Sequence, residues 1–176
     1  MADSRLVRAA LNAIGLEVVL QDEADGFLSD CRIENGRLLV AARCSISNIL
    51  HEAGHLAILP ARFRPWACDD LDVMTVRMLD AIADLDPDSP LYRAALQCGD
   101  AEATAWAFAF GTHLKIAPEE IIEDYQYEGT GEHVRLCLSM RAYLGINGLA
   151  HAGFCSTNRF GRLPVYPSLA SWLQPA

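Results

Sequence analysis

The first forty residues change from a helical to a strand-like pattern of apolar positions. Over residues 5–14, apolar side chains recur at a spacing of three and four, which predicts a helix that Gly15 ends. The next segment, LEVVLQ (16–21), is typical of a short strand. The segment CRIENGRLLVAA (31–42) places Asn35-Gly36 between two apolar-rich runs. Because both central positions of a type I′ turn need positive φ, this dipeptide predicts a β-hairpin.

The segment CSISNILHEAGHLAILP (44–60) predicts a central helix. Ser45 or Ser47 can cap its start, Pro60 can end it, and apolar residues lie on most of its faces. Gly54 inside the helix costs about 1 kcal/mol relative to alanine, which is reasonable where another backbone must approach closely.

The rest of the chain is mostly helical in pattern. The expected features are a helix over 71–84 capped by Asp70, a helical region from Ser89-Pro90 that Gly99 divides and Asp100 recaps, a short helix from Pro118, a helix over 132–144 and an extended tail over 161–176. We therefore expect an α+β fold, mostly helical, with a small N-terminal antiparallel sheet. Residues 1–176 are expected to form a single domain, in which 126–176 pack as an extension on a core of 1–125.

Composition and charge narrow the class of protein. Hydrophobic residues make up 52% of the chain, enough for a core, and the net charge is −9. Because a negative surface repels phosphate backbones and anionic headgroups, we expect neither direct nucleic-acid binding nor a membrane partner. No stretch is apolar enough for a signal peptide or a membrane span, and the six cysteines include no CxxC pair. These features indicate a cytoplasmic protein with reduced thiols.

The stretch ILHEAGHLAIL (49–59) contains the candidate metal ligands and the candidate catalytic residue. On a helix, residues four apart lie one above the other, so His51 and His55 can direct two imidazole nitrogens at one point. This HExxH arrangement is typical of zinc hydrolases. Glu52 lies about 100° around the helix from His51, displaced from the ligand pair but able to reach a metal-bound water. We therefore predict His51 and His55 as metal ligands and Glu52 as the general base.

A catalytic zinc usually has three protein ligands, so a third must come from another element. Glu102, in GDAEATAWAFAFG (99–111), is the predicted third ligand because its small neighbours allow close packing against the helix that contains Gly54. Asp100 is the nearest alternative and His151 is a weaker one. The ligand types favour zinc, although iron, cobalt or nickel could occupy the same site.

The segments ISNILHEAGHLAIL (46–59) and DAEATAWAFAFG (100–111) together resemble the ImmA/IrrE family of zinc-dependent, gluzincin-like peptidase domains. The resemblance covers about residues 1–125. It implies a zincin-like active-site helix with His51, His55 and Glu102 as ligands and Glu52 as base. It also implies a bacterial or phage setting and, in some members, cleavage of a repressor-type regulator.

The leading hypothesis is a zinc-dependent hydrolase that cleaves a peptide bond in a protein or peptide, such as a regulatory protein, with metal-bound water activated by Glu52. One alternative is a metal-binding regulatory or interaction domain with little or no peptidase activity, and another is hydrolysis of a small amide. A tetrahedral intermediate also needs an oxyanion donor. The candidates in loop-like segments are Tyr125, Tyr127, His133 and His151.

Overall fold

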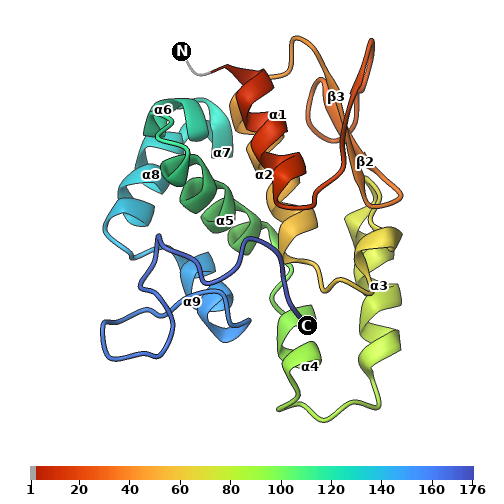
Figure 1. The fold of residues 1–176 in the computed structure, drawn as a ribbon, viewed down its shortest axis with the longest axis vertical. Helices are drawn as coiled ribbons and strands as arrows, with labels where there is room; N and C mark the ends of the chain where they lie inside the picture. Colours follow the sequence, from red (N-terminus) through yellow and green to blue (C-terminus); the bar gives the residue numbers. More distant parts are fainter. Residues whose placement is uncertain (1–2) are drawn as a thin grey trace.

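The computed structural model of the protein describes residues 3–176, and for residues 71 and 72 it describes the backbone alone. In chain order the elements are α1 (Ser4–Ala13), β1 (Val18–Gln21), β2 (Cys31–Glu34), β3 (Arg37–Ala41), α2 (Ile46–Ile58), the 3₁₀ helix η1 (Arg64–Trp66), α3 (Leu71–Ile82), α4 (Pro90–Ala95), α5 (Asp100–His113), α6 (Pro118–Ile121), α7 (Gln126–Gly129), α8 (Gly131–Ser139) and α9 (Leu144–His151). Figure 1 shows α2 and α5 in the middle of the molecule, with α1 and the sheet on one side and α8 and α9 on the other. The α+β class expected from the sequence is confirmed.

The sheet has the strand order β1-β3-β2. The predicted hairpin is confirmed, because β2 and β3 are antiparallel and Asn35 and Gly36 have φ angles of 51° and 76°. The prediction of a wholly antiparallel sheet is wrong, since β1 pairs with β3 in parallel. Strand β3 is buried at four of its five residues and takes the centre, while residues 22–30 carry the chain from β1 to the far edge of the sheet. The sheet is therefore mixed.

The outer edge of β2 is covered by the segment that precedes α3. The Oδ1 atom of Asp69 accepts a hydrogen bond from the backbone N–H of Ile33 at 2.7 Å. Glu34 forms an isolated antiparallel bridge with Cys68. The backbone of this strand is therefore engaged on both sides at these positions.

Helix α2 has the bounds and burial that its sequence predicts. The Ser45 hydroxyl accepts a hydrogen bond from the backbone N–H of Asn48 at 3.2 Å, and the helix ends two residues before Pro60. A Cβ added at Gly54 would lie 2.5 Å from the backbone oxygen of Ala103 on α5. The glycine thus permits the close approach of a second backbone that the sequence led us to expect.

Helix α5 begins at Asp100, and the N-cap position belongs to Gly99. The expectation that Asp100 caps this helix is therefore corrected, because its side chain turns toward α2 instead. Helix α9, which the apolar pattern does not predict, packs against the first turn of α5. A Cβ added at Gly145 of α9 would collide with the backbone oxygen of Ala101.

The predicted helix over 132–144 is too long. Helix α8 ends at Ser139, and Arg141 adopts a left-handed conformation with φ of 59°, which separates α8 from α9. Within residues 3–176, no helix has both the length and the apolar character that crossing a bilayer requires.

The C-terminal residues 152–176 form no helix and pack on the two central helices. The indole Nε1 of Trp106 donates to the backbone oxygen of Trp172 at 3.0 Å. The backbone N–H of Gln174 donates to the backbone oxygen of Ala57, near the end of α2, at 2.9 Å. This segment therefore connects the end of α2 to the middle of α5.

Candidate metal centre

The two histidines of α2 point at one place, as their spacing predicts. Their Nε2 atoms are 3.2 Å apart, and the ring planes are inclined at 80°. His55 is buried, with 5% of its surface exposed, and burial lowers its pKa. Burial therefore favours the neutral imidazole, which is the form that binds a metal ion.

Asp100 brings a carboxylate to the same place. Its Oδ1 atom lies 3.1 Å from Nε2 of His51 and 3.7 Å from Nε2 of His55. The imidazoles of His51 and then of His55, which lie close to the carboxylate, hold the pKa of Asp100 below its usual range, so the carboxylate is ionised. The position follows from α5: Asp100 is its first residue, and the close contact at Gly54 sets this first turn beside α2.

His51, His55 and Asp100 form a group, called the metal group below, that could hold a metal ion, since their ligand atoms all lie within 4.8 Å of one another. Two imidazole nitrogens and one carboxylate oxygen suit a borderline cation such as Zn²⁺. Three protein ligands also leave coordination positions for water or substrate. The donor set therefore fits the metal chemistry expected from HExxH.

Glu102, the predicted third ligand, does not belong to this group of the described residues. Its carboxylate lies against α9, where a Cβ added at Gly148 would collide with it. Residues two apart on a helix point about 200° from each other, so Glu102 and Asp100 cannot face the same neighbour. The structure brings the alternative named from the sequence, Asp100, to the imidazoles instead.

Glu52 lies in the same cleft as the three candidate ligands. It is buried, with 5% of its surface exposed, and it lines a cleft of about 700 Å³ together with His51, His55 and Asp100. Burial raises the pKa of Glu52 to about 7, with His51 opposing this shift and the negative charges of Asp69 and Asp100 adding to it. The carboxyl group is therefore more basic than an exposed glutamate.

The cleft also has walls that could contact a substrate. Phe27, which is 84% exposed, and Ile33 contribute apolar surface, and Asp69, Asp70 and Thr75 contribute polar groups. The Asp70 carboxylate accepts a hydrogen bond from the backbone N–H of Val73 and so caps α3, as predicted. The metal group thus opens into a cavity of mixed character rather than lying sealed in the core.

Tyr127, one of the candidate oxyanion donors, lies behind the metal group instead of in the cleft. Its hydroxyl is 3.4 Å from Nδ1 of His51, the ring nitrogen that faces away from His55 and Asp100. Tyr127 is not one of the described residues that line the cleft. Sequence reasoning identified this tyrosine but not its place, because the left-handed backbone at Tyr127 and Glu128 redirects the chain there.

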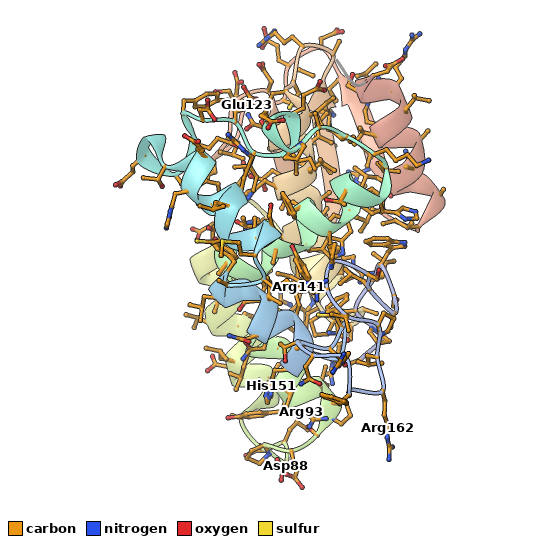
Figure 2. All side chains as sticks on the ribbon, turned by 90° about the vertical axis from the view of Figure 1, so that its left-hand side faces the viewer. Asp88, Arg93, Glu123, Arg141, His151 and Arg162 are labelled. Carbon is orange, nitrogen blue, oxygen red and sulfur yellow. The ribbon has the colours of Figure 1, made fainter. Side chains whose placement is uncertain are left out.

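The other three candidates lie away from the group. Tyr125 is 65% exposed, and the Nε2 atom of His133 contacts the sulfur of Cys137 at 3.5 Å. His151, also weighed as a ligand, lies near Arg93 at the end of the molecule opposite Glu123 (Figure 2). Of the described residues that line the cleft, none is one of these three.

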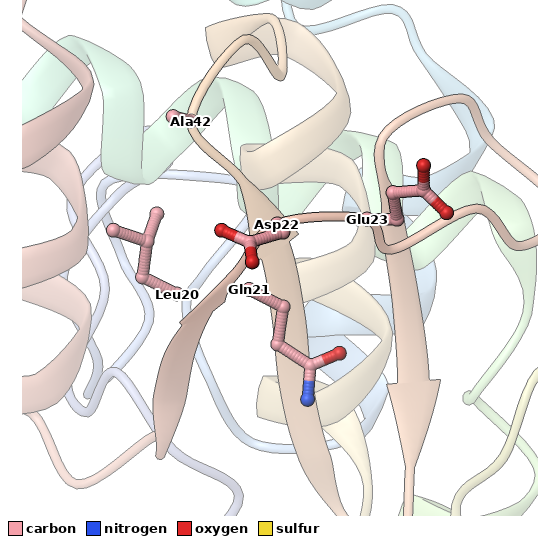
Figure 3. A pocket seen from close by; sticks show the side chains of 5 residues that line it. All are labelled: Leu20, Gln21, Asp22, Glu23 and Ala42. Atoms are coloured by element: carbon pink, nitrogen blue, oxygen red, sulfur yellow. The ribbon is translucent and has the colours of Figure 1, made fainter.

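A second hollow lies at the end of β1 and is lined by Leu20, Gln21, Asp22, Glu23 and Ala42. Figure 3 shows that the carboxylates of Asp22 and Glu23 point apart. They therefore do not form a chelating pair, and the residues that line this hollow show no arrangement comparable with the metal group.

The chain was compared with family models, with curated proteins and with solved structures. None of these comparisons gives a significant match. The description of the site therefore depends on the geometry of its own residues.

Proposed function

We propose that this protein is a zinc-dependent hydrolase that cleaves a peptide bond in a protein or peptide, with His51, His55 and Asp100 as metal ligands and Glu52 as base. The observation that carries the proposal is the convergence of two imidazole nitrogens and a carboxylate oxygen beside a buried glutamate in one cleft. Ligand sets of this kind are typical of catalytic zinc sites.

The residues of the chain can be given distinct tasks. Zinc held by these three ligands would supply a Lewis acid and would lower the pKa of a water ligand toward about 7. Glu52 lines the cleft beside both imidazoles, so its carboxylate is placed to accept the proton that an attacking water loses. The same group would then donate that proton to the leaving amine, which is a poor leaving group as an anion.

The proposal includes a zincin-like role for α2 and an ImmA/IrrE-like arrangement of α2 and α5. Its support is the order of the elements: α2, which contains HEAGH, precedes α5, a later helix whose first turn carries the acidic third ligand. In this chain that acid is Asp100, two positions before the Glu102 that the resemblance implies.

Metal content is the first test. Protein purified without added metal is analysed for bound elements, and wild type is expected to hold about one equivalent of zinc. His55→Ala should hold almost none, because two ligands rarely retain zinc where three are usual. Equal zinc content in both proteins would place the metal elsewhere.

Activity is the second test, with an unfolded protein and a mixture of fluorogenic peptides as substrates. Glu52→Gln keeps the size of the side chain but removes the base, so we expect a rate about 10²–10⁴-fold lower with zinc still bound. Glu132→Gln, the same change at an exposed position of α8, is the control and should match wild type. Equal rates for wild type and Glu52→Gln would favour a regulatory metal-binding domain, and turnover of small amides alone would favour an amidase.

A further inference from the structure

The Tyr127 hydroxyl stands between two side chains of the central helices. It lies 2.7 Å from Oγ1 of Thr104 on α5 and 3.4 Å from Nδ1 of His51 on α2. The rings of Tyr127 and His51 meet edge to face, with centroids 6.4 Å apart. Thr104 is fully buried, so its hydroxyl must find its partners within the protein.

The direction of these hydrogen bonds follows from counting hydrogens. The Thr104 hydroxyl donates to the backbone oxygen of Asp100 at 2.8 Å, since a carbonyl oxygen can only accept. Because a hydroxyl has one hydrogen, Thr104 must accept from Tyr127. The hydrogen of Tyr127 is then committed, so its oxygen accepts from His51, which must carry a hydrogen on Nδ1.

The segment that carries Tyr127 is fastened to the start of α2. The Ser47 hydroxyl donates to Oε1 of Glu123 at 2.7 Å, and the side-chain amide of Gln126 donates to Oδ1 of Asn48 at 3.5 Å. Glu123 lies at the end of the molecule shown at the top of Figure 2. The helix that supplies both histidines therefore also anchors the tyrosine.

The backbone at this position is unusual for residues with a side chain. Tyr127 and Glu128 both have left-handed dihedrals, with φ of 54° and 58°, and Gly129 follows with φ of 81°. The Thr130 hydroxyl donates to the backbone oxygen of Tyr127 at 2.7 Å and helps to hold the turn. Consecutive residues in this region are strained, and such strain persists where surrounding contacts hold it in place.

We propose that Tyr127 is a positioning residue that fixes His51 as its Nδ1–H tautomer and links it, through Thr104, to the backbone of Asp100. The Nε2 atom of His51 is then left with a lone pair directed at the metal group. This inference rests on the proposed function, because it assigns Tyr127 a task only if that group binds a metal. One hydrogen-bonded chain would thus join the imidazole of one proposed ligand to the backbone of another.

The test measures Zn²⁺ affinity by competition with a chromophoric chelator. Losing a partner of this kind typically weakens metal binding about 10–100-fold. We expect that loss for Tyr127→Phe, which removes only the hydroxyl, and for Thr104→Val, which breaks the chain at its middle. Thr104→Ser keeps a hydroxyl and should bind close to wild type. Tyr125→Phe, the same change at an exposed position of the same segment, should leave affinity unchanged.

A second measurement separates positioning from general packing. In zinc-loaded, ¹⁵N-labelled protein, the Nδ1–H of His51 should give a slowly exchanging imidazole resonance that Tyr127→Phe loses. Thermal unfolding of each metal-free variant checks that the fold is intact, and Thr104→Val serves if Tyr127→Phe does not fold.

The outcomes distinguish this inference from the proposed function. If wild type binds zinc and both Tyr127→Phe and Thr104→Val bind it equally well, the positioning role is overturned while the metal site stands. If wild type itself does not bind zinc, the proposed function and this inference fall together.

Discussion

At the scale of single residues, Asp100 and Glu102 show how two carboxylates of one helix serve different neighbours. They point about 200° apart around α5. Asp100 faces the imidazoles of α2, and Glu102 faces Gly148 of α9. We therefore expect one of them to bind metal and the other to contribute to packing.

This difference gives a first prediction. Asp100→Asn should weaken Zn²⁺ binding by more than about 100-fold, beyond the range for partners outside the ligand set, whereas Glu102→Gln should change it by less than a few fold. Chelator competition measures both constants under the same conditions. The reverse order would restore Glu102 as the third ligand, as the sequence predicts.

The site was predictable where it depends on one helix. The spacing of His51 and His55 and the displacement of Glu52 follow from helical geometry alone. The third ligand depends on how α5 lies on α2, which is a matter of long-range packing. The alanines around Glu102 indicate close packing, but they do not tell which helix each side of α5 meets.

At the scale of elements, the contact between α2 and α5 determines the site. A methyl group at Gly54 would meet a backbone oxygen, which cannot rotate away as a side chain can. Every proposed ligand lies within one turn of this contact or at the start of α5. The separation of the two helices is therefore also the separation of the ligands.

Gly54→Ala should destabilise the protein by about 1–3 kcal/mol, because the clash outweighs the gain of about 1 kcal/mol in helix propensity. Urea unfolding measures this loss. The variant should also bind Zn²⁺ more weakly, since α5 must move away from α2. A variant as stable as wild type, with unchanged affinity, would show that the helices can separate without cost.

The contact between α5 and α9 gives a paired prediction. A Cβ at Gly145 meets the backbone of Ala101, whereas a Cβ at Gly148 meets the flexible carboxylate end of Glu102. Gly145→Ala should therefore lose about 1–3 kcal/mol of unfolding free energy, and Gly148→Ala distinctly less. Denaturant titrations of the two variants side by side decide the order, and equal losses would contradict this account.

The elements themselves were predictable to different degrees. Asn35-Gly36 determines the hairpin locally, and Ser45, Asp70 and Ser89 each cap a helix where the sequence places one. The parallel pairing of β1 was not predictable, because it depends on which strand takes the buried centre. Helix α9 escaped prediction because its glycines, which favour close packing on α5, are poor helix formers.

At the scale of the whole molecule, the proposed ligands come from two helices far apart in the sequence, and the C-terminal segment hydrogen-bonds to both helices. An unfolded chain would not keep these donors together. Metal binding should therefore stabilise the folded state as a whole.

Adding Zn²⁺ to about 100 times its dissociation constant should contribute about 2.7 kcal/mol. For a chain of 176 residues this corresponds to a rise in Tm of about 5–10 °C. Differential scanning calorimetry with and without a chelator measures the shift. His55→Ala should show almost no rise, and an equal rise in that variant would mean that zinc acts at another place.

The covered edge of β2 has a consequence for how a polypeptide could be recognised. Asp69 already engages the N–H of Ile33, and Cys68 already bridges Glu34. A bound peptide therefore cannot pair with the outer edge of β2 as an additional strand at these positions. Under the proposed peptidase function, selectivity would depend on peptide side chains that fit between Phe27 and the carboxylates of Asp69 and Asp70. The sequence of a peptide, more than its extended shape, should then decide whether it is accepted.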